Sequence, residues 1–200
     1  MATKFSCNND YVLENDCVLL RPLVQDDCKY LLEFSLNETD TWKFGLVTAA
    51  GKDNLEKYVA EAVTERQLQK MYAFIVFDKR SNQYAGSTRF YDINLPFNTM
   101  QLGYTWYGER FRGTKLNEHC KYLLLQFAFE QVGLHRVEFR ADNNNARSIA
   151  AMKKIGCIPE GILRKHMPTL TGARRSSLVL SILQTEWHAD VKQKLNNLLK

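Results

Sequence analysis

The sequence predicts a single α/β domain built on a mixed sheet with helices on both faces. The chain has 200 residues and 45% hydrophobic residues, enough for one sizeable core. In its second half, strand-like and helix-like segments follow in the order β-α-β-α-β-β, an order typical of α/β folds. No repeat, low-complexity tract or Pro/Gly/Ser-rich linker divides the chain. We therefore expect one domain over 1–200, with its core at about 15–190.

The first half is expected to hold two helices among several strands. Asp26 or Asp27 can cap a short helix, and Asp53 with Glu56 resembles the capping box of a second one. The unbroken apolar run 72–77 fits a strand that is buried on both faces. The other strands expected here are Val18–Pro22, 84–92 and Thr99–Tyr107, and in the last of these Met100, Leu102, Tyr104 and Trp106 should share one face.

The second half begins with the clearest helix of the chain, 117–132. It carries an apolar stripe at helical spacing and is ended by Gly133. A helix over 145–155 is expected to stop at Gly156. The remaining elements expected are strands over 136–141, 157–166 and 177–183 and a final helix over 186–199.

Composition excludes several classes of protein. No apolar run approaches the roughly 20 residues of a membrane span, and residues 1–10 lack the apolar region of a secretory signal. The five cysteines are widely spaced and never form C-x-x-C, which favours reduced thiols in the cytoplasm over a metal site. A net charge of +5 suits an anionic ligand but is weak evidence for nucleic acid. We expect a cytoplasmic protein with no metal and no membrane partner.

A short basic turn between a strand and a helix is the most informative segment. It follows Thr99–Tyr107 and contains Gly113, which lets a ligand approach the backbone closely. The helix that follows offers unpaired N–H groups and the positive end of its dipole. Neither a P-loop nor a G-x-G-x-x-G fingerprint is present. The turn is suited to a phosphate or pyrophosphate, and an ordinary solvated loop is the alternative.

Three spaced motifs resemble those of the GNAT superfamily of N-acetyltransferases. Residues 110–115, RFRGTK, are similar to its pyrophosphate motif Q/R-x-x-G-x-G/A. Residues 145–148, NARS, followed by 153–157, KKIGC, resemble the second GNAT signature. Residues 160–164, EGILR, resemble a segment of the RimJ/RimL-like branch, which includes ribosomal-protein N-terminal acetyltransferases. The resemblance covers roughly 15–190.

The resemblance implies the GNAT fold and acetyl-CoA as co-substrate. In that fold two parallel strands splay apart and admit the pantetheine arm; here they would be Thr99–Tyr107 and 136–141. Asn145 would also bond the pantetheine amide, unless it serves only as a helix cap. Lys115 departs from the motif, which has glycine or alanine there. The cofactor-binding residues implied are Arg110, Phe111, Arg112, Gly113, Thr114, Lys115, Leu116, Asn145, Arg147 and Lys153.

Two catalytic residues are proposed from the same resemblance. Many GNAT enzymes place a tyrosine seven residues after the motif asparagine, where it protonates the departing thiolate; here that position is Met152. Ser148, one turn after Asn145, is the alternative donor. Glu160 is the candidate base, with a pKa raised by partial desolvation. The structural alternatives are a serine bonded to its own helix and a surface glutamate.

The expected reaction is direct acetyl transfer to a primary amine, because no cysteine falls at a catalytic position of these motifs. The acceptor is either a protein N-terminal α-amine or a small-molecule amine. The acceptor groove could be lined by Trp42, Tyr91, Tyr104 and Trp106, although aromatic residues at strand spacing are more often core. The branch also implies a homodimer. The alternative function is a non-catalytic acyl-CoA sensor, and a nucleic-acid-binding role through Arg164, Lys165, Arg174 and Arg175 is disfavoured because aromatic interleaving is absent.

Overall fold

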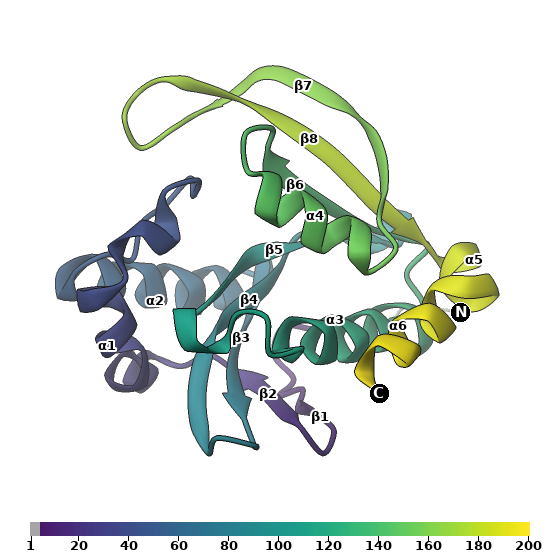
Figure 1. Ribbon diagram of the computed structural model, residues 1–200, viewed down its shortest axis with the longest axis horizontal. Coiled ribbons are helices and arrows are strands. Elements are labelled where there is room, and N and C mark those ends of the chain that lie inside the picture. Colours follow the sequence, from purple (N-terminus) through teal and green to yellow (C-terminus); the bar gives the residue numbers. More distant parts are fainter. Residues whose placement is uncertain (1–4) are drawn as a thin grey trace.

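The computed structural model describes residues 5–200 and contains one mixed sheet of eight strands in the order β1-β2-β3-β4-β5-β6-β8-β7 (Figure 1). Only β5 and β6 pair in parallel; the other neighbours are antiparallel. The strands are β1 Leu13–Glu14, β2 Val18–Pro22, β3 Met71–Asp78, β4 Gln83–Asn94, β5 Thr99–Tyr107, β6 Arg136–Asp142, β7 Ile158–Pro168 and β8 Arg174–Leu183.

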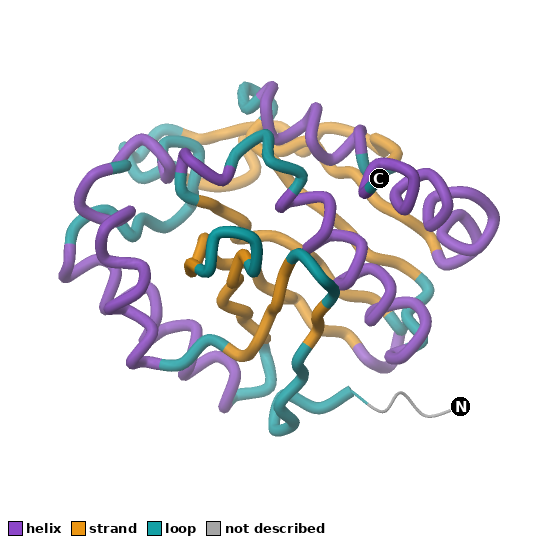
Figure 2. Tube along the Cα trace, turned by 60° about the horizontal axis from the view of Figure 1, so that its bottom comes forward, coloured by secondary structure: helices purple, strands orange, loops and turns teal. Residues whose placement is uncertain are grey.

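Helices cover both faces of this sheet, as Figures 1 and 2 show. Adjacent residues of β4 make the two faces explicit, because side chains alternate along a strand. Thr88 contacts α3, whereas Arg89 donates to the Tyr58 carbonyl of α2 on the other face. The helices are α1 Cys28–Asn37, α2 Lys52–Gln67, α3 Leu116–Gln126, α4 Ala146–Lys154, α5 Gln184–Glu186 and α6 Lys192–Leu199.

The sheet opens at its single parallel junction. β5 and β6 are paired only from Thr99↔Arg136 to Gln101↔Glu138, after which the two strands diverge. β5 also has a bulge against β4, in which Tyr104 and Thr105 lie opposite a single residue of β4. Tyr104 adopts a left-handed φ of 49° there. The second halves of β5 and β6 therefore form the two walls of an opening in the sheet.

The predicted strands and helices are confirmed, with local corrections. Asp27 is the N-cap residue of α1, but its side chain makes no capping hydrogen bond and pairs with Arg21 instead. The final predicted helix begins at Gln184 and is π-helical over Trp187–Val191. The capping box at Asp53 is wrong, because α2 begins at Lys52 with Gly51 at its N-cap. Tyr104 breaks the expected alternation of β5, because the bulge interrupts it. The helix predicted over 117–132 is α-helical only to Gln126 and ends in a π-helical segment before Gly133.

Candidate active site

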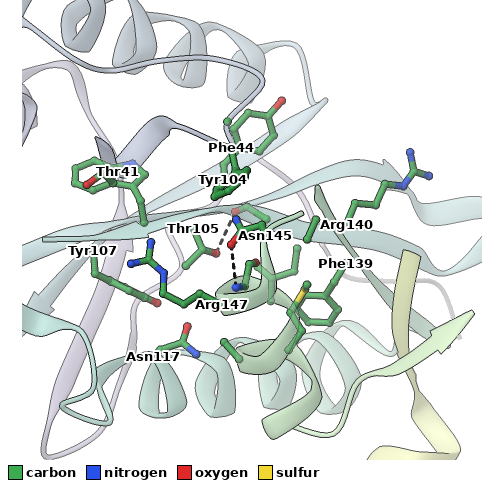
Figure 3. Close-up of a pocket in the computed structure, with 18 of the residues that line it drawn as sticks. Thr41, Phe44, Tyr104, Thr105, Tyr107, Asn117, Phe139, Arg140, Asn145 and Arg147 are labelled. Atoms are coloured by element: carbon green, nitrogen blue, oxygen red, sulfur yellow. Dashed lines mark hydrogen bonds between the residues drawn. The ribbon is translucent and has the colours of Figure 1, made fainter. Parts of the chain in front are cut away.

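A cavity of about 450 Å³ lies where β5 and β6 separate (Figure 3). Its walls come from both strands, from the first turns of α3, from α4 and from the loop over residues 41–47. This volume is in the range of pockets that hold small ligands. Figure 3 shows Arg147 of α4 pointing toward the side of the cavity where Tyr107 and Asn117 lie.

One end of the cavity, here called the cofactor end, is formed by the turn before α3. Gly113 lines the cavity with φ of 76°, and a Cβ built there would meet nothing within 4 Å. Lys115 is the N-cap residue of α3, is exposed, and has φ of 64°. It thus adopts the left-handed conformation that favours glycine, and no side chain caps the helix behind it. The N–H groups of the first turn are left for a ligand.

The two arginines of this turn differ in their surroundings. Arg112 lines the cavity, donates to the Tyr107 carbonyl at 3.2 Å and to Thr41 Oγ1 at 2.7 Å, and pairs with Glu109 at 3.2 Å. Arg110 lies outside the cavity lining and pairs with Glu33 of α1 at 3.2 Å. Both guanidinium groups are therefore ion-paired, and Arg112 is the one of the two that lies at the cofactor end.

Helix α4 contributes a second wall. Asn145 stands at its N-cap, and its side-chain oxygen accepts from the Ser148 N–H at 3.1 Å. Asn145, Arg147 and Ser148 all line the cavity, as does the buried side chain of Met152. Of the predicted cofactor residues, the cavity includes Phe111, Arg112, Gly113, Asn145 and Arg147, whereas Arg110, Thr114, Lys115, Leu116 and Lys153 lie outside its lining.

Glu160 does not have the raised pKa that the sequence suggested. Its carboxylate accepts from Arg136 Nη2 at 2.7 Å and from Ser181 Oγ at 2.6 Å. The hydrogen bonds from Arg136, with a smaller one from Ser181, lower the pKa of Glu160 to about 2. The side chain lies on β7 outside the cavity lining. The expectation was wrong because Arg136, 24 residues away in sequence, becomes a partner only in the folded sheet.

The four predicted acceptor residues, Trp42, Tyr91, Tyr104 and Trp106, all line the cavity. The part of the lining formed by Phe44, Tyr91, Tyr104 and Arg175 is here called the acceptor end. Trp42 packs on Trp106 beside Thr41, which accepts from Arg112. The Trp42 indole N–H is buried and lacks a hydrogen-bond partner among residues 5–200.

Arg175 also lines the acceptor end and was not singled out as an acceptor residue. It donates to the Phe44 carbonyl at 3.2 Å and to Ser177 Oγ at 3.1 Å, and forms no ion pair within the described part of the chain. Burial lowers the pKa of its guanidinium. The acceptor end therefore offers one cation that makes no direct ion pair within residues 5–200, with Asp142 as the carboxylate that acts on it electrostatically.

Lys121 is the cavity residue that sequence reasoning missed most clearly. It lies on α3 and is only 4% exposed, with its ammonium group bonded to Thr105 Oγ1 at 2.8 Å. Its position four residues after Asn117, on the same helix face, is the one signal that could have placed it in the cavity.

Residues 5–200 contain neither a clustered metal site nor a membrane-spanning helix. No group of three or more His, Cys, Asp or Glu side chains could hold a metal ion there. No described helix is both long enough and apolar enough to cross a membrane.

Comparison with known proteins gives consistent matches. The family model described as "Acetyltransferase (GNAT) domain" matches residues 18–158. The Bacillus subtilis protein named "Probable N-acetyltransferase YjcK" is 23% identical over 180 residues, 88% of this chain and 98% of that protein. A GCN5-related N-acetyltransferase structure from Brucella melitensis has a TM-score of 0.87 at 24% identity, covering 96% of this chain and 86% of that one. Mycobacterium smegmatis RimJ, solved with CoA-disulfide, has a TM-score of 0.77 at 18% identity, covering 94% and 93%.

Proposed function

The chain belongs to the GNAT acetyltransferase family and is an acetyl-CoA-dependent acetyltransferase; we propose that it belongs to the RimJ/RimL-like branch and transfers acetyl directly to a protein N-terminal α-amine. The observation that carries the proposal is the cavity between β5 and β6, with an open glycine turn and a helix N-terminus at one end. Such a terminus suits the diphosphate of CoA.

The residues present fit this co-substrate. The Gly113 turn leaves space for the phosphates, and Arg112 adds a positive charge beside it. The facing backbone edges of β5 and β6 can bond the pantetheine amides, because the two strands do not pair with each other beyond Gln101↔Glu138. The similar RimJ protein was solved in complex with CoA-disulfide, which supports the same assignment.

Ser148 is the residue to which we assign a role in the reaction of the thioester. It lines the cavity on the first turn of α4, and we assign its hydroxyl the role of a hydrogen-bond donor to the departing sulfur. Glu160 is not assigned the role of base, because a carboxylate with a pKa of about 2, bound to Arg136, accepts protons poorly. Water at the open acceptor end takes the proton from the incoming ammonium group.

The acceptor end favours a peptide over a polycationic amine. Arg175 would repel an acceptor that carries several positive charges, whereas Tyr91, Tyr104 and Phe44 provide apolar surface for the first side chains of a peptide. Carbonyl groups of a bound peptide could accept from Arg175. A similar Bacillus subtilis protein is named "Putative ribosomal N-acetyltransferase YdaF", which supports the same acceptor class.

Thiol release from acetyl-CoA across a panel of amines tests the proposal. The panel compares neutral or acidic N-terminal peptides, the same peptides with acetylated N-termini, and polyamines and amino sugars. We expect release with the free peptides, at a kcat/KM at least about tenfold above that of the polyamines. Faster release with polyamines or amino sugars would show that the acceptor is a small molecule, and acetyl-CoA binding without turnover on any amine would indicate a sensor.

A further inference from the structure

Lys121 is a buried cation whose only hydrogen-bond partners within residues 5–200 are hydroxyl groups. Its Nζ donates to Thr105 Oγ1 at 2.8 Å and to Thr88 Oγ1 at 3.4 Å. These two hydroxyls also bond each other at 2.7 Å. No carboxylate of the described chain forms an ion pair with Lys121. The ammonium group therefore has two neutral oxygens as hydrogen-bond partners, and Lys121 lines the cavity.

The ammonium group lies in the gap between the two diverging strands. Thr105 belongs to the bulge of β5, beyond its last pair with β6. On the other side, the ring centroid of Phe139, the β6 residue next after that last pair, is 6.0 Å from Nζ. Both residues line the cavity between the cofactor end and the acceptor end. A thioester that reaches from one end to the other must pass Lys121.

An isolated buried ammonium is costly, so a functional reason for it is needed. Apart from the two threonines and Phe139, the groups facing it are Cys120 on α3 and Cys157 before β7. Burial raises the pKa of both thiols, to about 12 for Cys120, so neither supplies a negative charge near neutral pH. Burial lowers the pKa of Lys121 to about 8, which leaves it mostly protonated at pH 7 and able to give up a proton.

We propose that Lys121 is the acid that neutralises the CoA thiolate, taking the role that Met152 cannot fill. When the tetrahedral intermediate collapses, the carbon–sulfur bond breaks and its electron pair goes to sulfur. The Lys121 ammonium gives one proton to that sulfur, forming the CoA thiol and a neutral amine, and water then reprotonates the amine. Ser148 alone cannot supply this proton, because a serine hydroxyl is far less acidic than an ammonium group.

The inference about Lys121 rests on the proposed function. Binding measurements with CoA and with desulfo-CoA distinguish a failure of the inference from a failure of the proposed function. Desulfo-CoA lacks only the sulfur, so the ratio of its Kd to that of CoA isolates the interaction with the thiolate. Calorimetry at pH 8 should give a ratio of about ten or more for the parent, since a charge-assisted hydrogen bond is lost. Lys121→Met should bring the ratio close to one while its Kd for desulfo-CoA stays unchanged. Its kcat should fall on the order of 10²-fold.

Two controls keep the test decisive. Lys192→Met removes a lysine paired with Glu130, outside the cavity lining, and should leave the ratio at the parent value. Lys121→Met should unfold at a temperature no lower than that of the parent, because the substitution removes a buried charge. If Lys121→Met does not fold, Lys121→Arg, which keeps the charge, takes its place in the assay. Failure of the parent to bind either compound would overturn the proposed function. Equal affinities in the parent, or a ratio retained by Lys121→Met, would overturn only the inference.

Discussion

The cofactor end and the acceptor end of the cavity are built in different ways. The cofactor end comes from one short segment, in which the left-handed turn of Gly113 and Lys115 presents the first turn of α3. The acceptor end is assembled from segments that are distant in sequence, for example where Arg175 donates to the Phe44 carbonyl 131 residues away. A site made from local backbone geometry leaves a motif in the sequence, whereas a site made from tertiary contacts does not.

The largest expected effect is at the cofactor end. Gly113→Val places a branched side chain in the open space that the phosphates would occupy, at a left-handed φ of 76°. Losing two or three charge-assisted hydrogen bonds should weaken acetyl-CoA binding on the order of 10²–10³-fold by calorimetry. Gly172→Val is the matched control, because Gly172 has a similar φ of 84°, open space around it, and no place in the cavity lining.

Both variants carry the same backbone strain, so only their binding should differ. If Gly113→Val and Gly172→Val bind acetyl-CoA with equal affinity, the phosphates do not use this turn and the assignment of the cofactor end is wrong.

An intermediate effect is expected between the two ends. Ser148→Ala removes the hydroxyl assigned to the departing sulfur and should lower kcat on the order of 10²-fold in steady-state assays. Acetyl-CoA affinity should not change, because the cap of α4 uses the Ser148 backbone N–H rather than its hydroxyl. A kcat within about twofold of the parent would show that this hydroxyl is not needed. Catalysis would then depend on how the two ends of the cavity position acetyl-CoA and the acceptor.

The smallest effect is expected at the acceptor end. Arg175→Met removes one cation among several aromatic contacts and should raise the KM for a peptide acceptor about three- to tenfold, with the Kd for acetyl-CoA unchanged. Arg174→Met is the matched control, since its neighbouring guanidinium is exposed and bonds only the Lys165 and His166 carbonyls in the described structure. A change in acetyl-CoA affinity for Arg175→Met alone would mean that the two ends are not separate.

The sequence predicted most of the fold but only part of the site. Periodicity predicted the observed bounds of β5, and Gly113 lies on the cavity with open space beside it, as expected of a turn that admits a ligand. The bulge at Tyr104 could not be foreseen, because it depends on the register between β4 and β5. Glu160 was misjudged for a similar reason, since its partner Arg136 lies on another strand. Lys121 was overlooked because a lysine within a helix is normally solvated, and here both the sheet and the cavity enclose it.

The narrow junction between β5 and β6 has a consequence for the motions of the protein. Only three residue pairs join strands β1 to β5 with strands β6 to β8, whereas β6 and β8 share seven. Amide protons on the free stretch of β5 should therefore exchange with solvent by local opening, at a lower free energy than those of β3 and β4. A ligand that forms hydrogen bonds with the facing edges of both β5 and β6 would link strands β1 to β5 with strands β6 to β8. Such a ligand should slow this exchange and make the two groups of strands unfold as one cooperative unit.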